Sequence, residues 1–138
     1  MFDLDVIKKV SNIEKATGKS IIPILKEVPL STVIVALKEI PIVDLIDMVK
    51  SVSLKKLIKG LSIITLKEIK DIRVDKLKVV LKYGNMNTVA ELQNRLSERA
   101  IIITLNKLSV HELKSLLIED NLDIIISVIN NLGYINNN

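Results

Sequence analysis

The amino-acid sequence predicts an all-α fold, an array of about nine or ten short helices that is superhelical or packed as a compact bundle. Three observations predict it. A unit of similar residues recurs along 28–82, apolar residues within each unit fall on one helical face, and Pro, Ser or Thr stands near each unit's start. Such repetition is typical of stacked architectures, in which each short element buries its apolar face against its neighbours.

The recurring unit has a period of roughly twelve residues. It opens with a branched apolar residue, followed by Pro, Ser or Thr and then by Leu or Ile. The units read VPLSTVIVALKE, IPIVDLIDMVKS, VSLKKLIKGLSI and ITLKEIKD, and they start at Val28, Ile40, Val52 and Ile64. We expect the chain to break between helices near each of these residues and near Ile72.

Within each unit the apolar residues recur at i, i+3, i+4 and i+7, which is the spacing of one helix face and not the alternation of a strand. The first unit shows this with Leu30, Val33, Ile34 and Leu37. Helices this short do not persist alone in water, so they must pack on their neighbours. By the same spacing, Leu45 in the second unit is expected to be buried.

Before the recurring units we expect a helix over 3–15, with Gly18 as its C-terminal cap, and a short helix over 20–27. Pro23 lies in the first turn of the second helix, where a missing N–H is tolerated. Downstream we expect a helix over 73–82 and a break at 83–85, after which the strict spacing is lost. Further helices are predicted at about 88–96, 98–107, 110–118 and 122–132, with Gly133 after the last one.

Helix starts are indicated by Ser or Thr followed three residues later by Glu, the pattern of a capping box. This pattern occurs at Thr65, Thr88 and Ser109, and Ser53 is a further candidate cap. We expect each of these side chains to accept a hydrogen bond from the first turn of its helix.

In pattern, residues 28–82 resemble the short-helix superhelices of flagellar motor switch proteins and of magnesium-transporter cytosolic domains. Those folds also use helices of about a dozen residues introduced by Pro or Ser. The resemblance implies a stacked helical fold and no functional site, because it includes no functional motif.

Length and composition predict one domain over 1–138, formed by the 28–82 array, an 85–133 helical cap and a 134–138 tail. The longest apolar run is 33–37, far short of the roughly 18 residues that a membrane-spanning helix needs. The chain has no cysteine, which excludes disulfides and thiolate metal sites. We therefore expect a cytoplasmic protein without a membrane span.

Few motifs in the sequence indicate catalysis or ligand binding. Residues 18–20 read GKS, the end of a phosphate-binding loop, but the glycine expected five positions earlier is Ile13. His111 is the only histidine and stands in the predicted cap of a helix. The carboxylate pairs Asp44/Asp47 and Asp71/Asp75 have lysines or arginines nearby. We therefore expect no enzymatic activity, no cofactor, no metal and no small-molecule substrate.

The distribution of charge along the sequence is the one feature that indicates a function. The Lys50–Lys82 segment contains ten basic and three acidic residues, a balance of +7 within an overall +4. Lys55, Lys56 and Lys59 project away from the apolar face of their predicted helix. A basic strip could contact phosphates or an acidic partner. Its candidate contact residues are Lys50, Lys55, Lys56, Lys59, Lys67, Lys70 and Arg73.

Two functions follow from these patterns. The first is a protein-binding helical-repeat protein, whose partner is another protein or a second copy of the chain. The alternative is a nucleic-acid-binding accessory protein that uses the Lys50–Lys82 segment. The helices expected at 88–96 and 98–108, with Arg95 and Arg99 near their junction, add a weak helix-turn-helix pattern to that alternative.

Overall fold

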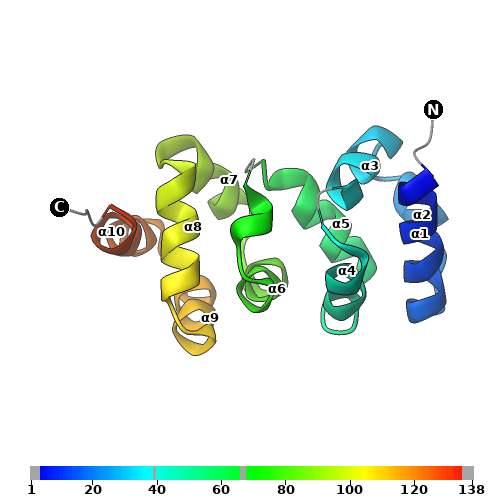
Figure 1. The fold of residues 1–138 in the computed structure, drawn as a ribbon. Helices are drawn as coiled ribbons and strands as arrows, with labels where there is room; N and C mark the ends of the chain where they lie inside the picture. The colour runs from blue at the N-terminus through cyan, green and yellow to red at the C-terminus, as the bar shows by residue number, and fades with distance from the viewer. Residues whose placement is uncertain (1–3, 39, 66–67, 135–138) are drawn as a thin grey trace. The chain divides into compact units, whose positions relative to one another are not determined.

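The structure is a computed structural model that describes residues 4–38, 40–65 and 68–134. Throughout these ranges it is helical and contains no β-strand, so the predicted all-α class is confirmed. The chain divides into two compact units, Met1–Ser62 and Ile63–Asn138, which we call unit 1 and unit 2. The helices are labelled in Figure 1. The division falls inside the predicted 28–82 array, and the assignment of the chain to one domain stays a prediction.

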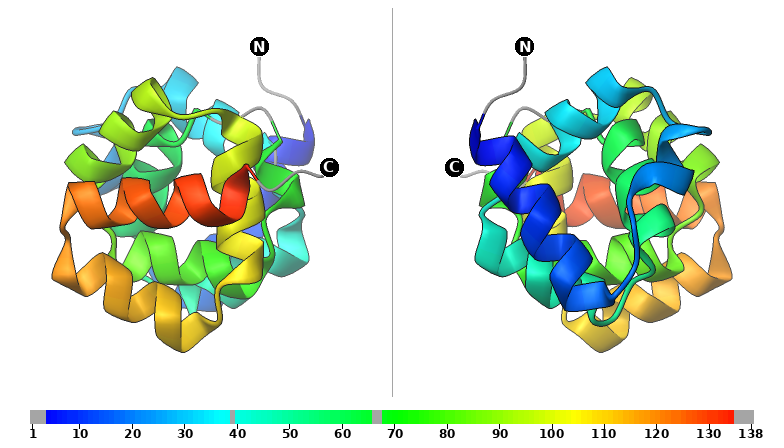
Figure 2. Two further views of the ribbon diagram at one scale, coloured as in Figure 1. Left: turned by 90° about the vertical axis from the view of Figure 1, so that its left-hand side faces the viewer. Right: turned by 90° about the vertical axis from the view of Figure 1, so that its right-hand side faces the viewer.

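Unit 1 is built around its first helix, which packs against the third and the fourth. The right panel of Figure 2 shows this first helix in blue, in front of the rest of the unit. The helices of unit 1 are α1 (Leu4–Thr17), α2 (Ile22–Leu25), α3 (Leu30–Lys38), α4 (Ile42–Val49) and α5 (Leu54–Ile63), of which the last residue, Ile63, falls in unit 2.

The positions of the two N-terminal helices were predicted correctly, but their lengths were not. Helix α1 continues to Thr17 and ends at Gly18 as expected, because Gly18 has the positive φ of 69° that favours glycine. The Gly18 N–H donates to the Glu14 carbonyl at 2.8 Å. Helix α2 is a single turn over Ile22–Leu25, shorter than the predicted 20–27, with Pro23 in that turn.

Helices α3, α4 and α5 begin two residues after the predicted breaks at Val28, Ile40 and Val52. Their apolar faces form the core of unit 1, in which Leu45 is fully buried, as predicted. Ser53 caps α5, since its hydroxyl oxygen accepts from the Lys56 N–H at 3.2 Å. The helix starts thus agree with the sequence pattern, whereas a repeat architecture stays a prediction.

The capping box predicted at Thr65 is wrong. The Glu68 N–H donates to the Glu98 carboxylate at 3.1 Å instead of to Thr65. The Thr65 N–H in turn donates to the Gln93 side chain at 2.8 Å. The next described element is a 3-10 turn, η1 (Ile69–Asp71), so bonds to residues distant in sequence replace the local cap at this position.

Unit 2 continues with five helices of similar length. They are α6 (Val74–Tyr83), α7 (Met86–Arg95), α8 (Glu98–Lys107), α9 (Val110–Glu119) and α10 (Leu122–Gly133). Each start lies 12 residues after the one before it, a regularity that was not expected beyond residue 85. Helix α6 packs against α9, and α8 packs against α10. The left panel of Figure 2 shows the chain turning sharply from α8 into α9 and from α9 into α10.

Side-chain caps set the helix starts in unit 2. The box predicted at Ser109 is confirmed, with Ser109 and Glu112 each accepting from the other's backbone N–H. The box predicted at Thr88 is wrong because α7 starts earlier, where the Asn85 side chain accepts from the Asn87 N–H at 2.9 Å. The Thr88 hydroxyl is therefore inside the helix and donates to Asp120 at 2.7 Å.

Gly133 is the last residue of α10 and is buried, although it was expected to follow the helix. A Cβ atom at this position would overlap the backbone of Ala100 at the start of α8. The absence of a side chain therefore allows the end of α10 to approach the start of α8 closely.

Three helices of each unit match in spacing. Helices α3, α4 and α5 begin at 30, 42 and 54, and α8, α9 and α10 begin at 98, 110 and 122. Each start in unit 2 therefore lies 68 residues after its counterpart (98 − 30, 110 − 42 and 122 − 54). Burial agrees with this offset, because Leu45 matches Leu113 and both are at most 2% exposed.

Candidate functional site

The predicted basic contact residues divide between the two units. Lys50, Lys55, Lys56 and Lys59 belong to unit 1, whereas Lys70 and Arg73 belong to unit 2, and Lys67 lies outside the described residues. Of the described residues in this set, Lys59 is partly exposed and the others are exposed. The structure therefore places Lys55, Lys56 and Lys59 on one helix, α5, and does not define one continuous basic strip.

Within α5, two of the predicted lysines already have a carboxylate partner. The Nζ atoms of Lys55 and Lys59 lie 2.8 and 3.1 Å from the two oxygens of Glu27. Hydrogen bonds from Lys55 and then Lys59 lower the pKa of the Glu27 carboxyl from its ordinary value. These lysines hold a charge partner that a phosphate would have to displace, which reduces their value as a phosphate site.

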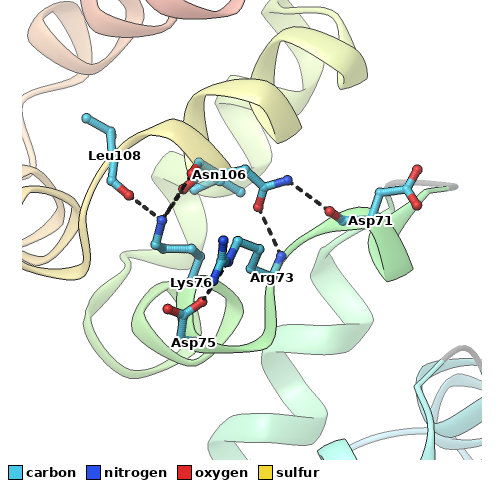
Figure 3. A network of polar contacts seen from close by, with 7 residues as sticks. Asp71, Arg73, Asp75, Lys76, Asn106 and Leu108 are labelled. Atoms are coloured by element: carbon cyan, nitrogen blue, oxygen red, sulfur yellow. Dashed lines mark hydrogen bonds and ion pairs between the residues drawn. The ribbon is translucent and has the colours of Figure 1, made fainter.

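Lys76, one of the ten basic residues in the predicted segment, is not part of any exposed face. Its side chain is buried, and Nζ donates to the carbonyls of Leu105 and Asn106, each at 3.2 Å, and of Leu108 (Figure 3). These carbonyls end helix α8, where backbone acceptors lack helical partners. The lysine therefore stabilises a helix end.

Asn106 extends this polar cluster at the same helix end. Its side-chain oxygen accepts from the Arg73 N–H at 3.0 Å, and its side-chain nitrogen donates to the Asp71 carbonyl at 2.9 Å. The Arg73 guanidinium points to Asp75, with Nε 3.7 Å from the carboxylate (Figure 3). The cluster connects the end of α8 to the start of α6, and Arg73 is partly neutralised within it.

Unit 1 contains the same lysine arrangement at matching positions. Lys9 of α1 is buried, and its Nζ donates to the carbonyls of Leu37 at 2.9 Å, Lys38 at 3.4 Å and Ile40 at 2.8 Å. Adding 68 to 37, 38 and 40 gives 105, 106 and 108, the three acceptors of Lys76 in unit 2. Neither lysine was singled out from the sequence as buried, because its partners lie about thirty residues away along the chain.

The remaining sequence candidates do not form a catalytic site. His111 is exposed in the first turn of α9, as expected from the sequence. Lys19 and Ser20 of the GKS stretch line a shallow hollow of about 470 Å³ in unit 1 together with Glu27. Glu27 would repel a phosphate there. Among the described residues, no group of three or more His, Cys, Asp or Glu side chains could hold a metal ion.

The helix-turn-helix candidate corresponds to α7 and α8, which are separated by only Leu96 and Ser97. Arg95 is held by Glu91, whose carboxylate lies 2.5 Å from the arginine Nε. In the part of the chain that the structure describes, no helix has the length and apolar character to cross a bilayer.

An apolar groove in unit 1 is a feature that the sequence analysis missed. It has a volume of about 370 Å³ and lies between α1, α2 and α3. The residues that line it are Val6, Ile7, Val10, Ser11, Glu14, Ile21, Leu25, Leu30, Val33 and Ile34. One sequence feature could have indicated the groove, namely that α1 has apolar residues on more than one face. In the structure Val6 is buried, whereas its neighbour Ile7 is exposed.

Burial separates the floor of this groove from its walls. Val6, Ile21 and Val33 are buried and form the floor, whereas Ile7 and Leu30 are 47% and 42% exposed. Exposed aliphatic side chains on both sides of a hollow are unusual on a surface that stays in water. The groove offers apolar contact area and no reactive group, so binding is the chemistry that it can perform.

Lysines occur in the same segments of the chain, but none of them lines the groove. Lys8 follows Ile7 in α1, Lys15 follows Glu14, Lys26 follows Leu25, and Lys38 is the last residue of α3. All four are exposed. The carboxylate of Glu14, which lines the groove, accepts from the Ile21 N–H at 2.8 Å. The lining of the groove is therefore mainly apolar, with the Glu14 carboxylate as its charged group.

Unit 2 has an apolar pocket of its own. The cavity is smaller, about 60 Å³, and its walls are almost entirely aliphatic. Leu77 of α6, Val89 of α7 and Ile101 of α8 line it, together with Ile64 and Ile72 from the stretch that precedes α6. An apolar cavity of this size is a packing defect rather than a ligand site.

Comparisons of the chain with protein-family models, with curated proteins and with solved structures give no match.

Proposed function

We propose that the protein is a non-enzymatic interaction module of the helical-repeat type that binds another protein through the apolar groove of unit 1. The exposed aliphatic walls of that groove are the observation that carries the proposal. Burying such side chains against a partner releases about 25 cal/mol for each Å² of apolar surface removed from water. The proposed absence of enzymatic activity rests on the lack of cysteine and on the isolated, exposed His111.

The nucleic-acid alternative has weaker support. Lys55 and Lys59 are bound to Glu27, Lys76 is buried, and Lys82 lies with its Nζ 5.4 Å from the centre of the Tyr83 ring. These engagements remove several of the charges on which a phosphate-binding strip would depend. A cytoplasmic location is proposed together with the protein-binding function, on the basis of the cysteine-free sequence.

Site-specific photo-cross-linking tests the proposed function. A photoreactive amino acid replaces Ile7 in the groove, and in a matched control it replaces Ile118, an exposed aliphatic residue of α9 in unit 2. After irradiation in an extract of cells that express the chain, we expect a protein adduct at position 7 that is absent at position 118.

A second variant keeps the test independent of folding. Leu30→Asp places a charge in the opposite wall of the groove and should abolish the adduct at position 7 while leaving the helical circular dichroism and the Tm unchanged. No adduct at position 7, or equal adducts at positions 7 and 118, would contradict the proposal.

A further inference from the structure

We propose that Tyr83 of unit 2 is a nucleophilic modification site, whose phenol oxygen attacks sulfonyl and phosphoryl electrophiles while the ammonium groups of Lys82 and Lys114 stabilise the negative charge. The basis is geometric, because two lysines from different helices place their Nζ atoms beside one tyrosine ring. The site lies in unit 2 and shares no residue with the groove of unit 1, so it goes beyond the proposed binding function.

The Tyr83 ring is held by apolar packing at the end of α6. Tyr83 is the last residue of that helix and is half-buried. Its side chain packs against a cluster of the buried residues Val79, Val80, Leu113 and Leu117. The first two belong to α6 and the other two to α9, so the ring lies where these helices meet. Two packed helices therefore fix the position of the phenol.

Each of the two helices contributes one lysine to this ring. Lys82 precedes Tyr83 in α6, and its Nζ lies 5.4 Å from the centre of the ring. Lys114 follows the buried Leu113 in α9, and its Nζ lies 4.8 Å from the same point. Both distances are within the range of cation–π attraction. Both lysines are exposed, so the site is open to molecules in solution.

The two ammonium groups act on the phenol oxygen as well as on the ring. A hydrogen bond from Lys114 is the largest cause that lowers the pKa of the Tyr83 phenol from its ordinary value. Partial desolvation opposes this shift, and the charges of Lys114 and Lys82 and a hydrogen bond from Lys82 add to it. A larger share of the phenol is therefore present as phenolate, the form that attacks electrophiles.

The modification forms one bond and breaks one bond. The phenol first gives its proton to water. The phenolate oxygen then attacks the sulfur of a sulfonyl fluoride or the phosphorus of a fluorophosphonate, and fluoride leaves with the electron pair of the broken bond. Negative charge grows on the sulfonyl or phosphoryl oxygens during the attack, and the nearby ammonium groups stabilise it. The product is an aryl sulfonate or aryl phosphonate ester of Tyr83.

The only other tyrosine of the sequence, Tyr134, is a matched control. It is 50% exposed, whereas Tyr83 is half-buried, so a reagent reaches Tyr134 more easily. Hydrogen bonds with the Ser97 side chain and then with its backbone N–H, which lies 3.1 Å from the hydroxyl, also lower the pKa of the Tyr134 phenol. These donors are neutral. A faster reaction at Tyr83 would therefore report the lysine charges and not accessibility.

An aryl sulfonyl fluoride and an alkyl fluorophosphonate are the two probes. The full chain is incubated with each probe at about pH 8, and peptide mass spectrometry follows the formation of the ester at Tyr83 and at Tyr134. We expect Tyr83 to react at least about tenfold faster than Tyr134 with both probes, because the ammonium groups stabilise both the phenolate and the charge that develops during attack.

Substitution of Lys114 separates the role of its charge from that of its packing. Lys114→Met keeps most of the side-chain length and should slow labelling of Tyr83 about tenfold, whereas Lys114→Arg keeps the cation and should retain most of the rate. The pH at which the Tyr83 rate levels off should rise in Lys114→Met, because the cation that lowers the phenol pKa is lost. Labelling of Tyr134 and the Tm should be unchanged in both variants.

Equal or faster labelling of Tyr134 would overturn the proposal, because exposure alone would then explain the reaction. Labelling of Lys82 or Lys114 in place of Tyr83 would overturn it as well, as would an unchanged Tyr83 rate in Lys114→Met. Labelling by the sulfonyl fluoride alone would overturn the phosphoryl half of the proposal and leave the sulfonyl half standing. None of these results depends on the groove of unit 1, so the proposed function is tested separately.

Discussion

Units 1 and 2 use the same lysine cap and the same helix spacing, yet they differ in the size of the apolar pocket that each contains. The exposed large apolar side chains of the described residues are divided almost evenly, with five in unit 1 and four in unit 2. In unit 2 a ten-residue helix, α7, stands between the first helix and the third one, whereas the corresponding α2 of unit 1 has four residues. The comparison teaches that two units with the same lysine cap can differ in the length of their second helix and in the size of their apolar pocket, about 370 Å³ in unit 1 and about 60 Å³ in unit 2.

The largest expected effects come from truncating matched core residues. Leu45→Ala in α4 and Leu113→Ala in α9 should each reduce the free energy of unfolding by about 2–5 kcal/mol, because both side chains are fully or almost fully buried. Urea denaturation followed by circular dichroism measures this. Val43→Ala, at a side chain that is 73% exposed, is the control. An effect below about 0.5 kcal/mol at Leu45 would mean that the helix face is assigned wrongly.

The lysine caps sharpen the comparison. Lys9→Met and Lys76→Met keep the length and apolar stem of the side chain but remove the donor to three helix-end carbonyls. Each should cost about 1–3 kcal/mol, because buried acceptors lose their partner. Hydrogen exchange should show the loss mainly in the unit that contains the substitution. Lys8→Met, at an exposed neighbour, is the control, and equal effects of Lys8→Met and Lys9→Met would refute the structural role.

Helix caps differ between the units and allow a smaller test. Ser109 caps α9 with its side chain, whereas its counterpart at α4, Pro41, makes no side-chain cap. Ser109→Ala should destabilise unit 2 by about 0.5–2 kcal/mol, measured by urea denaturation. Ser115→Ala, an exposed position in the same helix, should change stability by less than about 0.5 kcal/mol. A similar loss at both positions would argue against the cap.

The smallest expected effect is the pH dependence of the Glu27 cluster in unit 1. Its lysine partners depress the carboxyl pKa in the folded state below the ordinary 4.5, so their contribution is present above that value and is lost as the pH falls through the folded pKa. Glu27→Gln should therefore be less stable than the wild type at pH 7, and the difference should shrink below about pH 4.5. Glu119→Gln is the control for removing an exposed carboxylate. A difference that does not change with pH would contradict the assignment.

Much of the fold was predictable because helix periodicity and caps are local. The starts of α3, α4 and α5 followed from branched apolar residues at fixed spacing, and the start of α9 followed from Ser109 and Glu112. The error at Thr88 arose because two residues could start the same helix. Asn85 does so in the structure, since the Thr88 hydroxyl instead binds Asp120, a partner that is distant in sequence.

The candidate site was less predictable because it depends on tertiary contacts. When lysines are counted along the sequence, Lys76 is included as a surface charge. The structure shows instead that its Nζ donates to three backbone carbonyls. In the same way, the two faces of α1 are both apolar in sequence, and no local pattern tells that Ile7 lies beside an open groove. The 68-residue offset between the carbonyls bound by Lys9 and by Lys76 likewise becomes visible only in the folded chain.

Each unit contains one buried lysine, and this gives the chain a built-in chemical reporter. A free amine must reach solvent before an acylating reagent can attack it, and Lys9 and Lys76 are only 7% and 6% exposed. Modification of either residue therefore requires its own helix end to open first. Brief labelling followed by peptide mass spectrometry would read the opening rate of unit 1 at Lys9 and of unit 2 at Lys76, in a single sample and without any substitution.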